Sequence, residues 1–161
     1  GAIVDQEKVK IEFTDTAFDV FQKVTDAAVT VMARSWPLLR EGKAGGVSMD
    51  LAAGSYFGGR KPADGRIDWT RSAIQIYNLI RGVSHPYPGA FTFLNGKKVL
   101  IWQAWPVDGN GLPGQIVSER PLLTGTGEGL LEIRKIQIEE EAEDAPESFA
   151  ATINPETAKF E

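Results

Sequence analysis

The stretch FTFLNGKKVLIWQAW, residues 91–105, decides the fold of the second half of the chain. Two apolar runs flank Asn95-Gly96, and both of these residue types tolerate the positive φ angles of a type I′ turn. The stretch therefore predicts a β-hairpin with strands over 91–94 and 99–105.

Three further β-strands are predicted downstream of the hairpin, separated by turns rich in Gly and Pro. They are expected at 115–118, 122–124 and 130–138. In the last of these the apolar residues change parity, which predicts a bulge near Arg134-Lys135. The Gly-rich run 125–129 lacks the Lys and helix of a phosphate loop, so it predicts a hairpin turn. Five short strands with such a bend favour a compact β-barrel of the oligonucleotide-binding type.

Upstream of the hairpin, residues 72–81 predict a short, well-buried helix with a narrow polar edge. Asp68 or Thr70 is expected to cap this helix. Asn78 and Arg81 lie three residues apart on it, so they share a face. Two interpretations of this pair stay open. The two side chains face a cleft between domains, or they hold the helix against the barrel.

The N-terminal part predicts the end of an α/β layer. Apolar residues alternate over 9–13, which is typical of a strand with one buried face. From Ala17 apolar residues recur at spacings of three and four, which predicts an amphipathic helix that covers a core. Thr14 or Asp15 is expected to cap this helix, and Pro37 to kink or interrupt it. A loop with four glycines at 54–65 marks a domain boundary.

Composition narrows the class of protein. The chain has no cysteine and one histidine, which argues against disulfides, thiolate ligands and a structural metal site. No segment is apolar for the roughly 18 residues that a membrane span needs, and the first residues lack the pattern of a signal peptide. A soluble, cytoplasmic protein is expected.

The negative charge is concentrated in the second half. Residues 1–62 hold eight Lys or Arg and eight Asp or Glu, whereas residues 63–161 hold nine and fourteen. The acidic run at 139–147 is typical of a solvated tail or strand end. A half-chain of this charge is expected to repel polyphosphate.

Four phrases in fixed order carry a family resemblance. They are FGGRKPADGRIDW at 57–69, IRG at 80–82, HPYPGAF at 85–91 and IW at 101–102. In this order they resemble the folate-dependent formyltransferase family. Residues 1–4 look like the end of that family's Asp-x-Gly-x-Ile motif, so the resemblance spans nearly the whole chain and implies that the chain is truncated.

The resemblance implies an α+β fold in two parts. Residues 1–62 would be the remnant of a Rossmann-like formyl-transfer domain with its linker, and residues 63–161 a small barrel like the oligonucleotide-binding fold. In the family an amine attacks the formyl carbon of 10-formyltetrahydrofolate. The catalytic Asp would stand two residues before Gly1 and its Asn and His partners further upstream, so no catalytic residue is expected here and the chain alone should be inactive.

The sequences of two of these motifs, at 57–62 and 85–91, resemble those of enzymes that formylate amino-sugar nucleotides, such as UDP-4-amino-4-deoxy-L-arabinose. They are less similar to the sequence of methionyl-tRNA formyltransferase. The acidic second half agrees, because a tRNA-binding surface is basic. Enzymes that oxidise the folate carrier, and a non-catalytic binding module, are the further alternatives. Exposed edges in residues 1–50 would favour association, for example as a homodimer.

Arg60, Lys61, Asn78 and Arg81 are the predicted substrate-binding residues. Arg60 and Lys61 are suited to a nucleotide diphosphate, although a Gly-rich loop with two cations is also typical of a solvated linker. His85 is expected to pack or hydrogen-bond within a turn. The four tryptophans, Trp36, Trp69, Trp102 and Trp105, are expected to pack in the core or at a domain interface.

Overall fold

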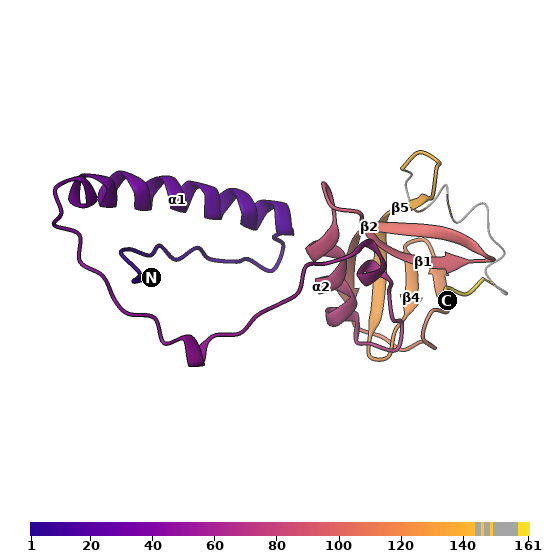
Figure 1. The fold of residues 1–161 in the computed structure, drawn as a ribbon. Helices are drawn as coiled ribbons and strands as arrows, with labels where there is room; N and C mark the ends of the chain where they lie inside the picture. The colour runs from indigo at the N-terminus through magenta and orange to yellow at the C-terminus, as the bar shows by residue number, and fades with distance from the viewer. Residues whose placement is uncertain (144–145, 147–148, 150–157) are drawn as a thin grey trace. The chain divides into compact units, whose positions relative to one another are not determined.

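The computed structural model describes residues 1–143, 146, 149 and 158–161 and separates into two compact units (Figure 1). Unit 1 is Gly1–Arg60 and unit 2 is Lys61–Glu161. The division falls two residues before the predicted end of the linker at residue 62. The assignment of residues 1–62 and 63–161 to two different domains stays a prediction.

Unit 1 is built on one long helix, α1, at Ala17–Arg40. Its N-cap is Thr16, whose hydroxyl accepts from the Asp19 N–H while the Asp19 carboxylate accepts from the Thr16 N–H. The expected cap at Thr14 or Asp15 is therefore wrong. The Asp15 carboxylate instead accepts a 2.7 Å bond from the Glu12 N–H, which closes the turn before the helix.

Pro37 was predicted to kink or interrupt α1, and the predicted interruption is wrong. The helix continues to Arg40, because Pro37 lies in its last turn and removes only one ladder hydrogen bond. The carbonyls of this turn accept from the N–H groups of Glu41, Gly42 and Lys43. Gly42 has a φ of 67°, the left-handed conformation that ends many helices.

The strand predicted over residues 9–13 is absent. Within the described part of unit 1 the β pairing is a single bridge between Ile3 and Val47, so no neighbouring strand accepts residues 9–13. The segment lies along α1 and is held by side chains instead. Arg34 donates to Asp5 at 2.6 and 2.8 Å and to Glu7 at 2.7 Å, and the Lys23 ammonium donates to the Lys10 carbonyl.

This attachment should weaken in acid. The Arg34 guanidinium, and after it the Ser35 hydroxyl, hold the pKa of the Asp5 carboxyl well below its ordinary value. A lowered pKa stabilises the folded contact above the ordinary Asp pKa, and this contribution is lost as the pH falls through the folded value. We expect the hydrogen-exchange protection of residues 3–13 to decrease below about pH 4. An Arg34→Gln variant should show the low protection at every pH, and equal protection in both proteins would contradict the role of Arg34.

Two short helical pieces flank the linker region, one at the end of unit 1 and one at the start of unit 2. The 3-10 helix η1 spans Leu51–Ala53 at the end of unit 1, and η2 spans Pro62–Gly65. The predicted second helix, α2, spans Ala73–Val83. Its N-cap is Ser72, which forms a capping box with Gln75, so the expected caps Asp68 and Thr70 are wrong.

The sheet of unit 2 confirms the five predicted strands. They are β1 at Ala90–Leu94, β2 at Lys97–Val107, β3 at Ile116–Glu119, β4 at Leu122–Gly125 and β5 at Leu130–Ile138. All neighbours are antiparallel, in the order β1-β2-β5-β4-β3. Asn95 and Gly96 have φ angles of 51° and 76°, which is the predicted hairpin turn.

The predicted bulge is also present. Ile101 pairs with Ile136, and Ala104 with Ile133, but Gln103 pairs with Lys135, so the register shifts beside Arg134. The run 125–129 forms the turn between β4 and β5, as expected. A sheet with one helix and these turns gives an α+β fold for unit 2.

The last residues of the chain bridge the two edges of the sheet. Glu161 donates its N–H to the Phe93 carbonyl of β1, and Phe160 donates to the Gly114 carbonyl just before β3. Lys159 forms a bridge with Gln115. Residues 159–161 therefore satisfy edge groups that would otherwise be unpaired.

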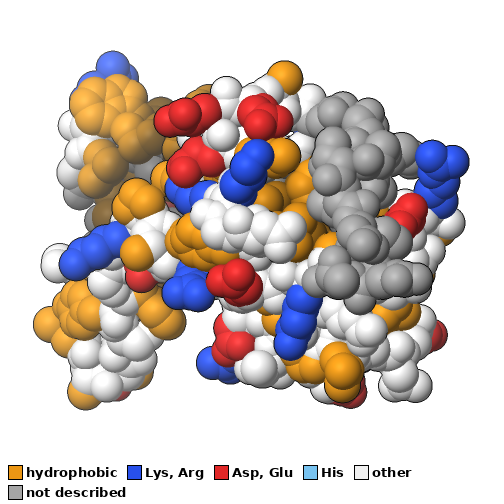
Figure 2. All heavy atoms as spheres, turned by 90° about the vertical axis from the view of Figure 1, so that its right-hand side faces the viewer, with side chains coloured by type: hydrophobic (Ala, Val, Ile, Leu, Met, Phe, Trp, Pro, Cys, Tyr) orange, Lys and Arg blue, Asp and Glu red, His pale blue; other side chains and the backbone are white. Residues whose placement is uncertain are grey.

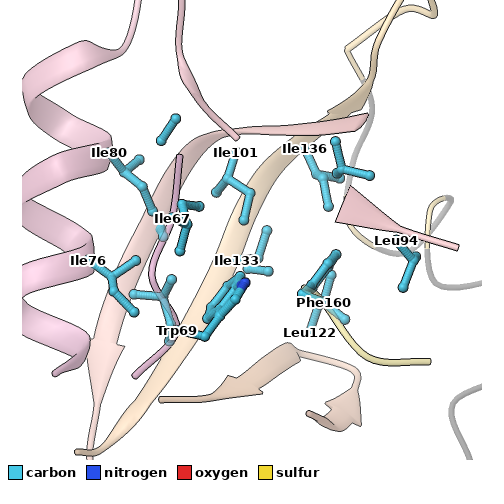
Figure 3. Close-up of a cluster of buried hydrophobic side chains, with 14 of the residues drawn as sticks. Ile67, Trp69, Ile76, Ile80, Leu94, Ile101, Leu122, Ile133, Ile136 and Phe160 are labelled. Carbon is cyan, nitrogen blue, oxygen red and sulfur yellow. The ribbon is translucent and has the colours of Figure 1, made fainter. Parts of the chain in front are cut away.

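The core of unit 2 lies between α2, the sheet and this terminal segment (Figure 3). Ile76 and Ile80 of α2 point toward Ile101 and Ile133 of the sheet. Phe160 is 1% exposed and its ring stacks on Trp69 at 5.4 Å. Trp69 and Trp102 are buried and Trp105 is half-buried, as predicted. Trp36 is 58% exposed on α1, so the packing expected for it is not seen within the described chain.

Two buried threonines should respond oppositely to the same substitution. Thr124 is fully buried and its hydroxyl has no hydrogen-bond partner among the described residues, whereas Thr92 accepts from Trp69 Nε1 and donates to the Glu161 carbonyl. We expect Thr124→Val to be neutral or to stabilise by up to about 1 kcal/mol, and Thr92→Val to cost about 1–3 kcal/mol. Urea unfolding of both variants measures the difference. An equal loss of unfolding free energy in the two variants would show that the Thr124 hydroxyl forms a hydrogen bond in solution.

Candidate functional site

The predicted pair Asn78 and Arg81 is brought together on α2. The helix begins at its Ser72 cap and buries Ile76, Tyr77 and Ile80, which leaves Asn78 on the outside. Arg81 donates from Nε to the Asn78 amide oxygen at 2.7 Å. This bond orients the guanidinium relative to the outer face of α2.

Arg81 is the first member of a row of cations and aromatic rings. Its guanidinium lies 5.7 Å from the Tyr77 ring, Tyr77 meets Trp105 edge to face at 5.5 Å, and Arg134 lies 5.1 Å from the Trp105 ring. We call these residues the cation–aromatic row. A cation over a ring face is held in an ordered position by its attraction to the ring. A surface of ordered cations and rings can bind a flat group by stacking or an anionic group by charge-assisted hydrogen bonds.

Trp105 and Arg134 could not be assigned to this row from sequence. They are on adjacent strands, and the pairing of Trp105 with Glu132 places them near each other. Arg134 also forms a 2.8 Å ion pair with Glu132, which neutralises part of its charge. Knowledge of the β2–β5 register would have been needed to find the pair.

Arg60 and Lys61 lie at the junction of the units. Arg60 is the last residue of unit 1 and Lys61 the first of unit 2, and both are exposed. The Lys61 N–H donates to the Asp64 carboxylate at 2.7 Å, at the start of η2. The sequence prediction thus separates into one pair on α2 and one pair in the linker.

A groove on unit 2 was not predicted. Two cavities of about 480 and 320 Å³ share Arg66 and Asp68 in their linings, so they adjoin each other. The first continues past Trp69 to Lys159 and Glu161, and the second runs along α2.

The charges in this groove partly cancel. The Thr70 hydroxyl, and after it the Thr70 N–H, lower the pKa of Asp68, so this side chain is a carboxylate at neutral pH. It pairs with Arg71 at 3.3 Å. The lining therefore offers mixed polarity rather than a single strong charge.

His85 occupies a turn, as expected. Its ring stacks on Trp102 at 3.8 Å, and Nε2 lies 2.5 Å from a Glu143 carboxylate oxygen. The pKa of Glu143 is lowered, first by Lys135 and then by His85. These contacts tie the α2–β1 loop to β2 and to the segment that follows β5, so the only imidazole has a structural role. Residues 144–145 and 147 of the acidic run lie outside the described residues.

No helix in the described part of the chain is long and apolar enough to cross a membrane. Among these residues no three His, Cys, Asp or Glu side chains gather closely enough to hold a metal ion.

Comparison with known proteins identifies the family. Crystal structures of HypX from Aquifex aeolicus share the fold across both units. A HypX variant matches with a TM-score of 0.70 and 18% identity over 94% of this chain and 28% of HypX. HypX in complex with tetrahydrofolic acid matches with a TM-score of 0.69 and 17% identity over 92% and 27%. Residues 60–154, more than half of the chain, match the family described as formyl transferase, C-terminal domain. The chain thus belongs to the formyltransferase family and carries that family's C-terminal domain.

Proposed function

We propose that the parent protein is a folate-dependent formyltransferase, which moves a formyl group from 10-formyltetrahydrofolate to an amine. The family match over residues 60–154 carries this proposal. The HypX structure with tetrahydrofolic acid supports a folate carrier, because its fold extends over 92% of this chain. The chain spans 27% of that HypX chain, so most of such a protein lies outside the matched region.

We assign the chemistry to residues upstream of Gly1. Acyl transfer needs a group that takes up the amine proton and donors for the developing oxyanion. In the family the Asn, His and Asp of the formyl-transfer domain supply these. Residues 1–62 would be the end of that domain with its linker, and residues 63–161 the barrel domain that follows it.

We propose an amino-sugar nucleotide as the acceptor, of the UDP-4-amino-4-deoxy-L-arabinose type. The phrases at 57–62 and 85–91 support this choice, as does the charge of unit 2, with ten Lys or Arg against fourteen Asp or Glu. On the face in Figure 2, basic and acidic side chains are interspersed, without the continuous basic field that tRNA requires. The C-terminal region of methionyl-tRNA formyltransferase is the alternative acceptor class.

Four residues are proposed to contact the anionic part of this acceptor: Arg60, Lys61, Asn78 and Arg81. The chemistry of these side chains supports this assignment. Guanidinium and ammonium groups bind phosphate through charge-assisted hydrogen bonds, and the Asn78–Arg81 bond orients one of them.

The reading frame upstream of Gly1 gives the first test. We expect it to encode Asn-x-His and, two residues before Gly1, Asp. The longer product should consume 10-formyltetrahydrofolate when given the amino-sugar nucleotide, and the 161-residue chain should not. Turnover by the short chain would place the catalytic groups inside it. Absence of turnover by both would favour a binding module.

In the longer product, Arg81→Ala should raise the KM for the acceptor about tenfold with little change in kcat, since binding alone is weakened. The matched control is Arg120→Ala, at an exposed position between β3 and β4. Steady-state kinetics with varied acceptor measures both. Equal KM values for the two variants would remove Arg81 from the proposed site.

A further inference from the structure

One arginine of unit 2 is ordered but has no counter-charge. The Arg66 guanidinium lies 5.6 Å from the centre of the Phe93 ring, and it forms no ion pair or side-chain hydrogen bond within the part of the chain that the structure describes. Its backbone is held as well, because the Arg66 N–H donates to the Ala63 carbonyl and the residue forms a bridge with Phe91 of β1. An ordered guanidinium whose N–H donors are unused is suited to an oxyanion.

Arg66 lines the smaller of the two cavities on unit 2, which has a volume of about 320 Å³. The full lining is Arg66, Asp68, Arg71, Gln75, Ile76 and Leu79. All six residues belong to unit 2 and to the segment that matches the C-terminal domain, so one domain supplies the whole lining. A volume of this size is at the lower end of the range for small-molecule sites.

The one carboxylate in this lining does not neutralise Arg66. Asp68 Oδ1 accepts from the Thr70 N–H at 3.0 Å and from the Thr70 hydroxyl at 2.6 Å. Asp68 Oδ2 accepts from Arg71 Nε at 3.3 Å, so the charge of Asp68 is paired with Arg71. The lining holds two guanidinium groups and one carboxylate, which leaves one uncompensated positive charge, that of Arg66.

Gln75 adds an oriented neutral donor to the cavity. Its side-chain oxygen accepts from the Ser72 N–H at 3.2 Å in the capping box of α2. The amide nitrogen of Gln75 has no hydrogen-bond partner among the described residues, so it is available to a ligand. Ile76, which is 2% exposed, and the half-buried Leu79 give the cavity an apolar wall.

We propose that this cavity binds a small molecule that carries one carboxylate. The carboxylate accepts from Arg66 and from the amide of Gln75, and the rest of the molecule lies on the apolar wall. A carboxylate matches the planar fork of a guanidinium, and its single negative charge equals the uncompensated charge of the lining. A phosphate dianion or a polyphosphate would bring more negative charge beside Asp68, which stays ionised at neutral pH.

This site is distinct from the proposed acceptor contacts. Arg60, Lys61, Asn78 and Arg81 are not part of the lining, so the inference goes beyond the proposed function and does not depend on it. Binding to the cavity is measured on the 161-residue chain without formyl transfer. Failure of this inference therefore leaves the proposed function untouched, and the reverse also holds.

Titration of the unmodified chain with 4-methylpentanoate, followed by amide NMR shifts, tests the proposal. We expect saturable shifts within residues 66–79 and a Kd of about 1 mM, the affinity range of a ligand of this size. The uncharged 4-methylpentanamide should bind about tenfold more weakly, because it brings no charge to Arg66. Inorganic phosphate at the same ionic strength should also bind more weakly. Equal affinity for the acid and its amide, tighter binding of phosphate, or shifts that do not saturate would overturn the proposal.

Three variants of the same chain locate the site. Arg66→Gln should weaken the binding of 4-methylpentanoate about tenfold, whereas Lys97→Gln, which removes an exposed cation outside the cavity, should leave it unchanged. Gln75→Glu keeps an acceptor for the Ser72 N–H but adds a second carboxylate to the lining, so it should lose binding at unchanged thermal stability. If Arg66→Gln and Lys97→Gln bind equally, or if Gln75→Glu binds like the unmodified chain, the carboxylate does not bind in this cavity.

Discussion

Replacing Phe160 with alanine should destabilise unit 2 by about 3–5 kcal/mol, the usual cost of removing a buried phenylalanine ring. Phe160 is 1% exposed and lies between two aromatic neighbours, Trp69 at 5.4 Å and Phe149 at 6.2 Å. The substitution leaves a cavity next to Trp69, whose Nε1 bonds to Thr92. A loss of this size is a large fraction of the stability of a small domain.

Urea unfolding followed by tryptophan fluorescence measures this loss. The matched control is Phe57→Ala, because Phe57 is 93% exposed and its removal should change the free energy of unfolding by less than about 0.5 kcal/mol. If Phe160→Ala costs no more than Phe57→Ala, residues 158–161 are not packed in solution as they are in the structure.

Gly127→Ala should have the second-largest effect, a destabilisation of about 3 kcal/mol, at the upper end for overpacking. A Cβ added at Gly127 would lie 1.9 Å from the Thr70 carbonyl oxygen, a backbone atom that cannot rotate away as a side chain could. The β4–β5 turn would have to move from the segment before α2. This movement breaks the 2.9 Å bonds from Gly127 N–H to Arg71 and from Ala73 N–H to Glu128.

Thermal unfolding of Gly127→Ala measures this cost. Gly59→Ala is the control, since an added Cβ at Gly59 meets nothing within 4 Å and its φ is not in the left-handed region. The control should be neutral or slightly stabilising because alanine restricts the unfolded chain. If the two variants unfold at the same temperature, the close approach of Gly127 to Thr70 does not exist in solution.

Much of unit 2 was predictable because its signals are local. Asn95-Gly96 fixes a hairpin by the φ angles it permits, and the change of parity before Ile136 locates the bulge. The helix cap was missed because Asp68, Thr70 and Ser72 are all good N-cap residues, and the reciprocal bonds between Ser72 and Gln75 favour Ser72.

Unit 1 was predicted less well because its pattern depends on neighbours. Alternation over residues 9–13 describes a strand only where another strand accepts its hydrogen bonds, and the described part of unit 1 offers none. The spacing along α1 predicted the apolar side of the helix. It could not show that the described chain leaves this side open, because spacing contains no information about what packs on it.

For the candidate site, helix spacing predicted that Asn78 and Arg81 share a face, and the structure joins them by a hydrogen bond. Trp105 and Arg134 needed the strand register, since they are 29 positions apart in the sequence. The bridging role of residues 159–161 was likewise beyond prediction, because Phe160 is a lone apolar residue without a periodic pattern.

The bridge made by residues 159–161 has a consequence for synthesis on the ribosome. Thr92 and Glu161, which this bridge joins, are 69 positions apart, so β1 is translated long before the residues that cover its edge. Until Glu161 leaves the exit tunnel, the nascent sheet exposes the edges of β1 and β3 to other chains. Closure of unit 2 therefore waits for the synthesis of residues 159–161, and a chaperone that shields sheet edges would act on this domain during that interval.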